Sequence, residues 1–184
     1  MVDKSGFVHE EEGLMRPNYY TGMLLTSEDF TNEQAYFLEK LRLHNRYLHG
    51  WGVACGFEVF IRDEFVVVEP GFAVDCAGNQ IMLSTPMEAI VPSDKRRIYI
   101  IAEYKEKKVN PVRVPGEPSR TEEDLYEMSR SQEICQLKFS DIDPSANHTD
   151  NGPGTPGCGL QHALSIASLH KNLRGWSVKL HARR

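Results

Sequence analysis

The sequence predicts an α+β fold in which one long N-terminal amphipathic helix packs on a mostly antiparallel β-sheet or small barrel. Two observations predict it: helical periodicity ends at Gly50, and from Gly56 onward apolar and polar residues alternate with period two. An apolar helix face and an apolar sheet face are commonly buried against each other. At 184 residues and 40% hydrophobic composition the chain can form one ordinary core. We therefore expect a flexible arm over residues 1–15 and a single α+β domain over residues 16–184.

The predicted helix runs from about Ser27 to His49. Thr26 and Asp29 have the spacing of a capping box, which satisfies backbone N–H groups at a helix start. Apolar side chains recur at steps of seven, four and seven residues and so share one face: Phe30, Phe37, Leu41 and Leu48. Gly50 is a natural end for the helix. A helix of this kind can nucleate a core or an oligomer.

The segment HGWGVACGFEVF follows the helix and predicts a packed corner that leads into a strand. Gly50, Gly52 and Gly56 surround Trp51 and Cys55, and glycine adopts backbone conformations that other residues avoid. Because large aromatic side chains dominate core energetics, we expect Trp51 to anchor the core where helix and sheet meet.

The remaining elements are predicted strands. Two hairpins are expected, 57–62 with 65–69 and 72–75 with 80–83, followed by strands over 87–91, 97–104, 134–139 and 161–170 and an apolar segment over 176–180. Arg97 to Tyr104, RIYIIAEY, is β-branched and aromatic without a breaker, which favours a central position in the sheet. Thr121 to Arg130 fits either a short helix or an irregular strand entry.

Two extended loops are predicted. Residues 105–120 carry three prolines and five basic residues, which indicates an exposed excursion from the sheet. Residues 141–159 are rich in Asp, Asn, Gly and Pro and are expected to be mobile or ordered only by a partner. The acidic residues of the arm and of this loop predict basic patches on that partner: Glu10, Glu11, Glu12, Asp141, Asp143 and Asp150.

Composition excludes several classes of function. The formal net charge is -5 and no long basic run occurs, so a nucleic-acid partner is not expected. No stretch approaches the roughly 20 apolar residues of a membrane span, and the N-terminus lacks a signal-peptide pattern. We therefore expect synthesis in the cytoplasm.

No residue pattern predicts catalysis, a cofactor or a metal. The chain contains no HExxH, GxSxG, Walker-type or GxGxxG motif. His44 and His49 lie near Cys55, but five residues apart they should point to different helix faces. The acidic loop does not match the EF-hand spacing. We expect no catalytic residue, no cofactor-binding residue, no metal ligand and no enzymatic activity.

The four cysteines are widely spaced and form no CxxC pair, which argues against a zinc ribbon or a thioredoxin-like centre. They are Cys55, Cys76, Cys135 and Cys158. Buried free thiols are expected, and two disulfides are the alternative.

The segment RPNYYTGMLLTSEDFTNEQAYFLEKLRLHNRYLHGWGVACGFEV, followed by VVVEPGFAVDCAGNQI, resembles small proteins encoded with phage-tail-like contractile injection systems. The match covers roughly residues 16 to 81, where the helix and both turns match together, and it continues weakly to residue 120. The resemblance implies a structural part of the particle rather than a reaction.

Two functions follow as hypotheses. The first is a non-enzymatic assembly protein in the baseplate, spike, cap or fibre-attachment region, forming a homo-oligomer and contacting other proteins of a particle that is cytoplasmic or released. The second is a small ligand-binding or hydrolytic β domain whose pocket uses Trp51, His44, His49 and Asp75. Size-exclusion chromatography with light scattering separates them, because an assembly protein should self-associate or bind a partner.

Overall fold

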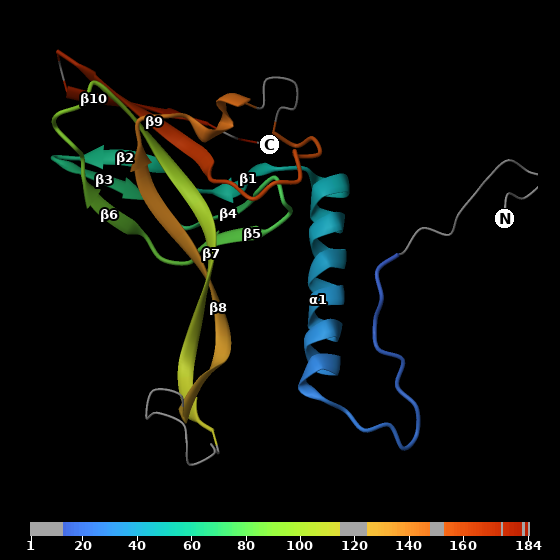
Figure 1. The fold of residues 1–184 in the computed structure, drawn as a ribbon. Coiled ribbons are helices and arrows are strands. Elements are labelled where there is room, and N and C mark those ends of the chain that lie inside the picture. The colour runs from blue at the N-terminus through green and yellow to red at the C-terminus, as the bar shows by residue number, and fades with distance from the viewer. Residues whose placement is uncertain (1–12, 115–124, 148–152, 174, 182, 184) are drawn as a thin grey trace, which may run out of the picture. The chain divides into compact units, whose positions relative to one another are not determined.

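The computed structural model describes residues 13–114, 125–147, 153–173, 175–181 and 183 (Figure 1). The chain divides into two compact units, with the boundary between Leu43 and His44. Most of the predicted arm, residues 1–12, lies outside the described residues. The single domain predicted over residues 16–184 stays a prediction.

The predicted helix is confirmed between Ser27 and His49. It consists of α1 (Ser27–His44) and a π-helical end, η1 (Asn45–His49). The capping box forms as the sequence predicts: the Thr26 N–H donates to Asp29 Oδ2 at 2.8 Å, and the Asp29 N–H donates to Thr26 Oγ1 at 3.4 Å. The bonds that the Thr26 N–H and the Thr26 hydroxyl donate to Asp29 Oδ2 hold the pKa of Asp29 below its usual value.

The predicted amphipathic burial of α1 is wrong for this chain, because none of its side chains is buried. Phe30, Phe37 and Leu41, here called the apolar stripe, are 52%, 55% and 43% exposed. The partly covered side of α1 carries Glu33, whose Oε2 accepts a 2.7 Å bond from the Tyr19 hydroxyl. Leu48, predicted on the same line, lies in η1, whose wider turns change its angular position. Packing of α1 on a sheet stays a prediction.

The second unit contains three antiparallel sheets. The first has the order β1 (Gly52–Gly56), β4 (Gly71–Val74), β5 (Gln80–Leu83), and the second β2 (Val59–Arg62), β3 (Phe65–Val68), β6 (Met87–Ile90). The third has the order β10 (Gly175–Leu180), β9 (Leu164–Asn172), β7 (Arg97–Arg113), β8 (Tyr126–Ser140), and a 3-10 helix, η3 (Pro144–Asn147), follows β8. Both predicted hairpins are confirmed, as β2 with β3 and β4 with β5.

The predicted small barrel is wrong, since none of the three sheets closes among the described strands. A bend between β1 and β2 explains why these strands join different sheets. Gly56 and Phe57 both have positive φ, at 64° and 53°. Gly71 permits this bend, because a Cβ there would lie 2.3 Å from the Phe57 nitrogen.

The core of this unit lies between the sheets, where β10 contacts β2 and β5 contacts β7 and β8. Its fully buried apolar side chains include Phe57, Ile81, Ile98, Leu164, Ile166 and Leu169. From Arg97 to Ala102 β7 lies between β9 and β8, which confirms the central position predicted for Arg97 to Tyr104 except at its last two residues.

The third sheet continues into a two-stranded extension. β9 pairs with β7 only from Arg97 to Ala102, whereas β7 and β8 pair with each other as far as Arg113 and Tyr126. We call Glu103–Arg113 with Tyr126–Gln136 the ribbon, which leaves the sheets as the yellow and orange strands in Figure 1. The loop predicted over 105–120 is thus wrong as far as Arg113. Pro111 is compatible with a strand because β7 is an edge strand here.

Candidate functional site

The corner after the helix is closed by a later loop. The Trp51 N–H donates to the Thr155 carbonyl at 3.2 Å, and the Gly154 N–H donates to the Trp51 carbonyl at 2.7 Å. Trp51 is only 2% exposed and belongs to the main core, which confirms its predicted role as an anchor. Residues 153–159 are therefore ordered by the chain itself, contrary to the prediction for 141–159, while residues 148–152 lie outside the described part.

Gly50 makes this closure possible. Its φ of 68° and ψ of -163° lie in a region that only glycine adopts readily. A Cβ at Gly50 would lie 2.4 Å from the Gly154 carbonyl carbon.

We expect Gly50→Ala to lower the free energy of unfolding by about 2–3 kcal/mol, from backbone strain and the displaced loop. Urea unfolding monitored by tryptophan fluorescence measures the loss. Gly154→Ala is the control, because Gly154 also has positive φ but a Cβ there meets nothing within 4 Å. Gly154→Ala should lower the free energy of unfolding by only about 1 kcal/mol. Equal losses of stability in the two variants would show that the contact between Gly50 and Gly154 is unimportant.

Asp75 organises the turn between β4 and β5. Its side chain is fully buried; Oδ1 accepts from the N–H groups of Ala77 at 2.9 Å and Asn79 at 2.8 Å, and Oδ2 accepts from Asn79 Nδ2 at 2.8 Å. Burial raises the pKa of Asp75, and the hydrogen bonds from Asn79 and Ala77 oppose that rise. This β4–β5 turn also contacts η1, because Asn45 Nδ2 donates a hydrogen bond to the Gly78 carbonyl at 2.8 Å.

His44 and His49 meet, contrary to the prediction that they point to different faces. Their Nε2 atoms lie 3.0 Å apart. The physical reason is the π-helical end, in which residues five apart share a face. Both histidines are exposed, whereas Trp51 and Asp75 are buried. This arrangement gives no support to a pocket built from these four residues.

Cys76, Cys158 and His162 come together at the same corner, although sequence analysis did not select them as site residues. Their ligand atoms all lie within 4.8 Å of one another, and Cys158 Sγ is 3.4 Å from His162 Nε2. Burial raises the pKa of the Cys76 thiol to about 12. Cys76 follows the Asp75 turn, whereas Cys158 and His162 lie in the loop before β9, so the cluster depends on tertiary contacts.

The prediction of buried thiols holds for Cys76 but is wrong for Cys55 and Cys158, which are exposed. Cys135 is partly buried, and burial raises its pKa to about 11. All four cysteines are free thiols in the structure.

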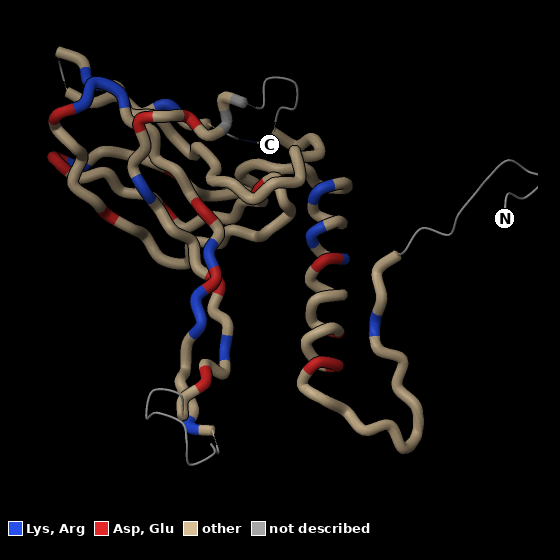
Figure 2. The backbone as a smooth tube through the Cα atoms, viewed as in Figure 1, with Lys and Arg blue, Asp and Glu red and all other residues tan. Residues whose placement is uncertain are grey.

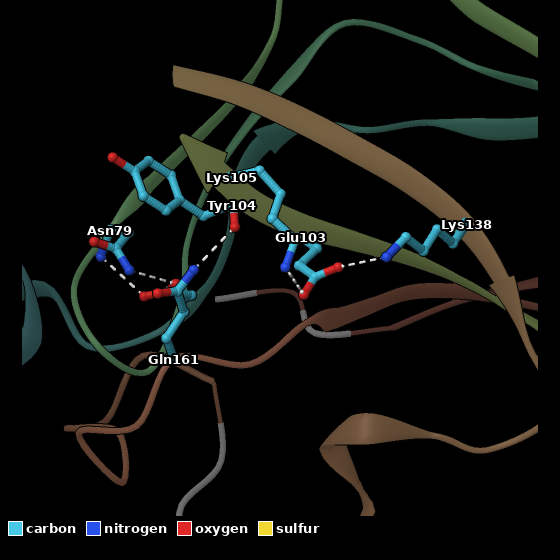
Figure 3. Close-up of polar contacts among 7 residues, drawn as sticks. Asn79, Glu103, Tyr104, Lys105, Lys138 and Gln161 are labelled. Carbon is cyan, nitrogen blue, oxygen red and sulfur yellow. Dashed lines mark hydrogen bonds and ion pairs between the residues drawn. The ribbon is translucent and has the colours of Figure 1, made fainter. Parts of the chain in front are cut away.

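Charged and polar groups hold the base of the ribbon together (Figure 3). Glu103 Oε1 lies 2.7 Å from Lys105 Nζ, and Glu103 Oε2 lies 2.8 Å from Lys138 Nζ on the neighbouring strand. The loop before β9 joins this base, because Gln161 Nε2 donates to the Tyr104 carbonyl at 3.0 Å. These contacts fix the direction in which the ribbon leaves the sheet.

Glu103→Gln should lower the free energy of unfolding by about 0.5–1 kcal/mol at neutral pH, a small loss because both lysines are partly exposed and screened. The hydrogen bonds from Lys105 and Lys138 lower the pKa of Glu103. This stability is therefore present above the unfolded-state pKa and lost as pH falls through the folded-state pKa. Urea unfolding across the acid range checks this, with Glu127→Gln on the exposed ribbon as control. An unchanged acid dependence in Glu103→Gln would contradict it.

The outer part of the ribbon is exposed on both faces. Lysines and arginines are interspersed with acidic residues along it (Figure 2). Near its far end three apolar side chains are exposed to solvent: Val112 at 45%, Tyr126 at 55% and Met128 at 52%. The ribbon thus presents mixed charge and apolar groups that have few contacts within the chain.

A cavity of about 160 Å³ lies between the second and third sheets. Its lining is apolar apart from Glu88 and Lys138: Val66, Val68, Met87, Ala89, Ile100, Leu137 and Phe139. A lining of this kind offers shape and apolar contact rather than groups for acid–base or nucleophilic chemistry.

The acidic residues predicted to meet a basic partner are only partly accounted for. Asp141 forms an ion pair with Lys95 of the same chain, with 2.9 Å between Oδ2 and Nζ. Glu10, Glu11, Glu12 and Asp150 lie outside the described residues. Across the part of the chain that is described, no helix has both the length and the apolar character to cross a membrane.

No protein-family model matches the chain, and no curated protein does. Solved structures that match the chain include a TssK-TssF-TssG baseplate subcomplex of the type VI secretion system, at 14% identity and a TM-score of 0.49. A baseplate complex from the type VI secretion system matches at 13% identity and a TM-score of 0.47. A crystal structure of TssK matches at 12% identity and a TM-score of 0.48. Each match covers 91% of this chain but only 60%, 58% and 41% of the solved chains. The chain thus spans at most about three fifths of the length of each solved chain it matches.

Proposed function

We propose that this chain is a non-enzymatic structural component of a contractile injection system or phage-tail-like particle. It would act in the baseplate, spike, cap or fibre-attachment region, as the sequence resemblance over residues 16 to 81 implies. The observation that carries the proposal is the ribbon, a long two-stranded extension whose outer part is exposed on both faces. Its function would be to bind other proteins of the particle.

The physics of isolated hairpins supports this role for the ribbon. A two-stranded hairpin is at best marginally stable in water, and three strands or a packed face are needed for independent stability. Beyond Ala102, β7 has no partner other than β8 among the described strands. A neighbouring protein that packs on the ribbon or pairs with its edge would supply the missing contacts.

The apolar stripe of α1 supports association through a second surface. Phe30, Phe37 and Leu41 follow one face of the helix and are each more than two-fifths exposed. Three large apolar side chains on one face typically mark a surface that packs against another protein. We propose that this face meets a second copy of the chain or a neighbouring particle protein, so that the chain functions as an oligomer.

Replacing the ribbon with a tight turn tests the proposal. Lys105 and Ile134 are directly paired, so an Asn-Gly turn between them would close β7 on β8 as a two-residue hairpin. We expect this variant to fold with its core intact but to be lost from particles purified from producing cells. Leu173→Ser is the control, because Leu173 is fully exposed at the turn between β9 and β10 and belongs to neither surface. Normal incorporation of the ribbonless variant would refute a binding role for the ribbon.

A further inference from the structure

We propose that Cys76, Cys158 and His162 form a zinc-binding site that joins the loop before β9 to the turn between β4 and β5. This inference is independent of the assembly function. It rests on three side chains whose ligand atoms converge although they come from two distant parts of the sequence.

The distances suit a tetrahedral zinc ion. Zinc binds thiolate sulfur at about 2.3 Å and imidazole nitrogen at about 2.0–2.1 Å, so a tetrahedral angle puts sulfur and nitrogen about 3.6 Å apart. Cys158 Sγ and His162 Nε2 are 3.4 Å apart, and Cys76 Sγ lies within 4.8 Å of both. Shifts of at most about 1 Å would bring all three atoms into the first coordination shell.

The donor set selects the metal. Two thiolates and one imidazole are ligands that zinc favours, whereas magnesium and calcium require oxygen. His162 is already oriented for this role, because its Nδ1 lies 3.0 Å from the Ala163 carbonyl. An Nδ1–H that donates to this carbonyl leaves the Nε2 lone pair facing Cys158. Histidine ligands of metals are commonly held by such a second hydrogen bond.

The backbone around the cluster is shaped for close approach. A Cβ at Gly157 would lie 2.6 Å from the Cys76 Cα, so only glycine lets the loop come this near. The Gly159 N–H donates to the Cys76 carbonyl at 3.2 Å. These contacts place Cys158, which lies between the two glycines, beside Cys76. A bound ion would lock the loop that also covers Trp51.

The three ligands leave one tetrahedral position for a water molecule or another exchangeable ligand. Cys158 is exposed, so this position is open to solvent or to a partner. Zinc sites of three protein ligands and one exchangeable ligand are well known.

Metal titration of the purified full-length chain tests the site. The reduced, chelator-treated protein is titrated with zinc against a chromophoric chelator, and cobalt is used to record the thiolate-to-metal charge-transfer band. We expect one zinc ion per chain and a higher melting temperature with zinc bound. Cys76→Ser, Cys158→Ser and His162→Ala should each weaken zinc binding by at least about 100-fold, and each cysteine variant should halve the cobalt band.

Cys55→Ser is the matched control, because Cys55 is exposed like Cys158 but lies outside the cluster. It should bind zinc like the unaltered chain. Since Cys158 and His162 are not buried, their variants decide the question even if Cys76→Ser does not fold. Binding of clearly less than one zinc ion per chain would overturn the proposal. Equal zinc affinity of the Cys158→Ser, His162→Ala and Cys55→Ser variants would also overturn it. So would a Cys76–Cys158 disulfide with no zinc uptake after its reduction.

Discussion

Trp51→Ala is expected to lower the free energy of unfolding by about 3–5 kcal/mol, a large part of the stability of a typical domain. Trp51 is 2% exposed and packs in the main core, where the sheets and the loop over residues 153–159 meet. Truncation leaves a cavity that the surrounding structure fills only partly, which adds to the lost burial of the indole.

Urea unfolding followed by circular dichroism measures this loss without depending on tryptophan fluorescence. Trp176→Ala is the matched control, since Trp176 on β10 is only partly buried against the core and faces Lys171 at 5.7 Å. We expect its loss to be about half as large or less. Equal losses at the two positions would mean that Trp51 is not the anchor of the corner.

The second large effect is expected at Asp75. Asp75→Ala removes the acceptor for three donors, the backbone N–H groups of Ala77 and Asn79 and the Asn79 side-chain amide. Buried donors without an acceptor each cost about 1–3 kcal/mol, so we expect a loss of about 3–5 kcal/mol. Thermal and urea unfolding would measure it, and a loss below about 1 kcal/mol would show that the turn re-forms its bonds elsewhere.

Asp75→Asn separates hydrogen bonding from charge. The asparagine keeps one oxygen for the two backbone N–H groups but puts an NH₂ group against the Asn79 amide. Because burial raises the folded-state pKa of Asp75, its linked stability is fully present below the unfolded-state pKa and is lost as pH rises through the folded-state pKa. Asp75→Asn should remove this pH dependence, and an unchanged acid profile would argue against it.

Local signals explain which elements could be predicted from sequence. The capping box at Thr26, the stop at Gly50 and the turns between paired strands each depend on residues close in the chain. Such signals predicted the helix and both hairpins correctly. They failed on the ribbon, because prolines indicated a loop although an edge strand tolerates them.

Long-range contacts explain what could not be predicted. The Cys76, Cys158 and His162 cluster needs the loop before β9 to fold back on the turn between β4 and β5, and spacing alone does not reveal such a contact. The proximity of His44 and His49 needs a π-helical end, which helical periodicity in the sequence does not predict. Helical periodicity did locate the apolar stripe but not its exposure, because an apolar face can serve the core or a partner.

Incorporation of Leu41→Asp into the particle tests the central claim, that association is the function and uses an exposed face of α1. Leu41 is 43% exposed in the chain, and aspartate there has lower helix propensity and opposes the helix dipole, so the substitution should lower the free energy of unfolding by only about 1 kcal/mol. In an interface it would bury an unpaired carboxylate and remove apolar contacts, and we expect incorporation to fall at least about tenfold. Asn32→Asp adds the same charge at an exposed residue on the opposite side of α1 and should be incorporated normally. Quantitative mass spectrometry of purified particles decides between the outcomes: selective loss of Leu41→Asp supports the account, and equal incorporation of both folded variants would contradict it.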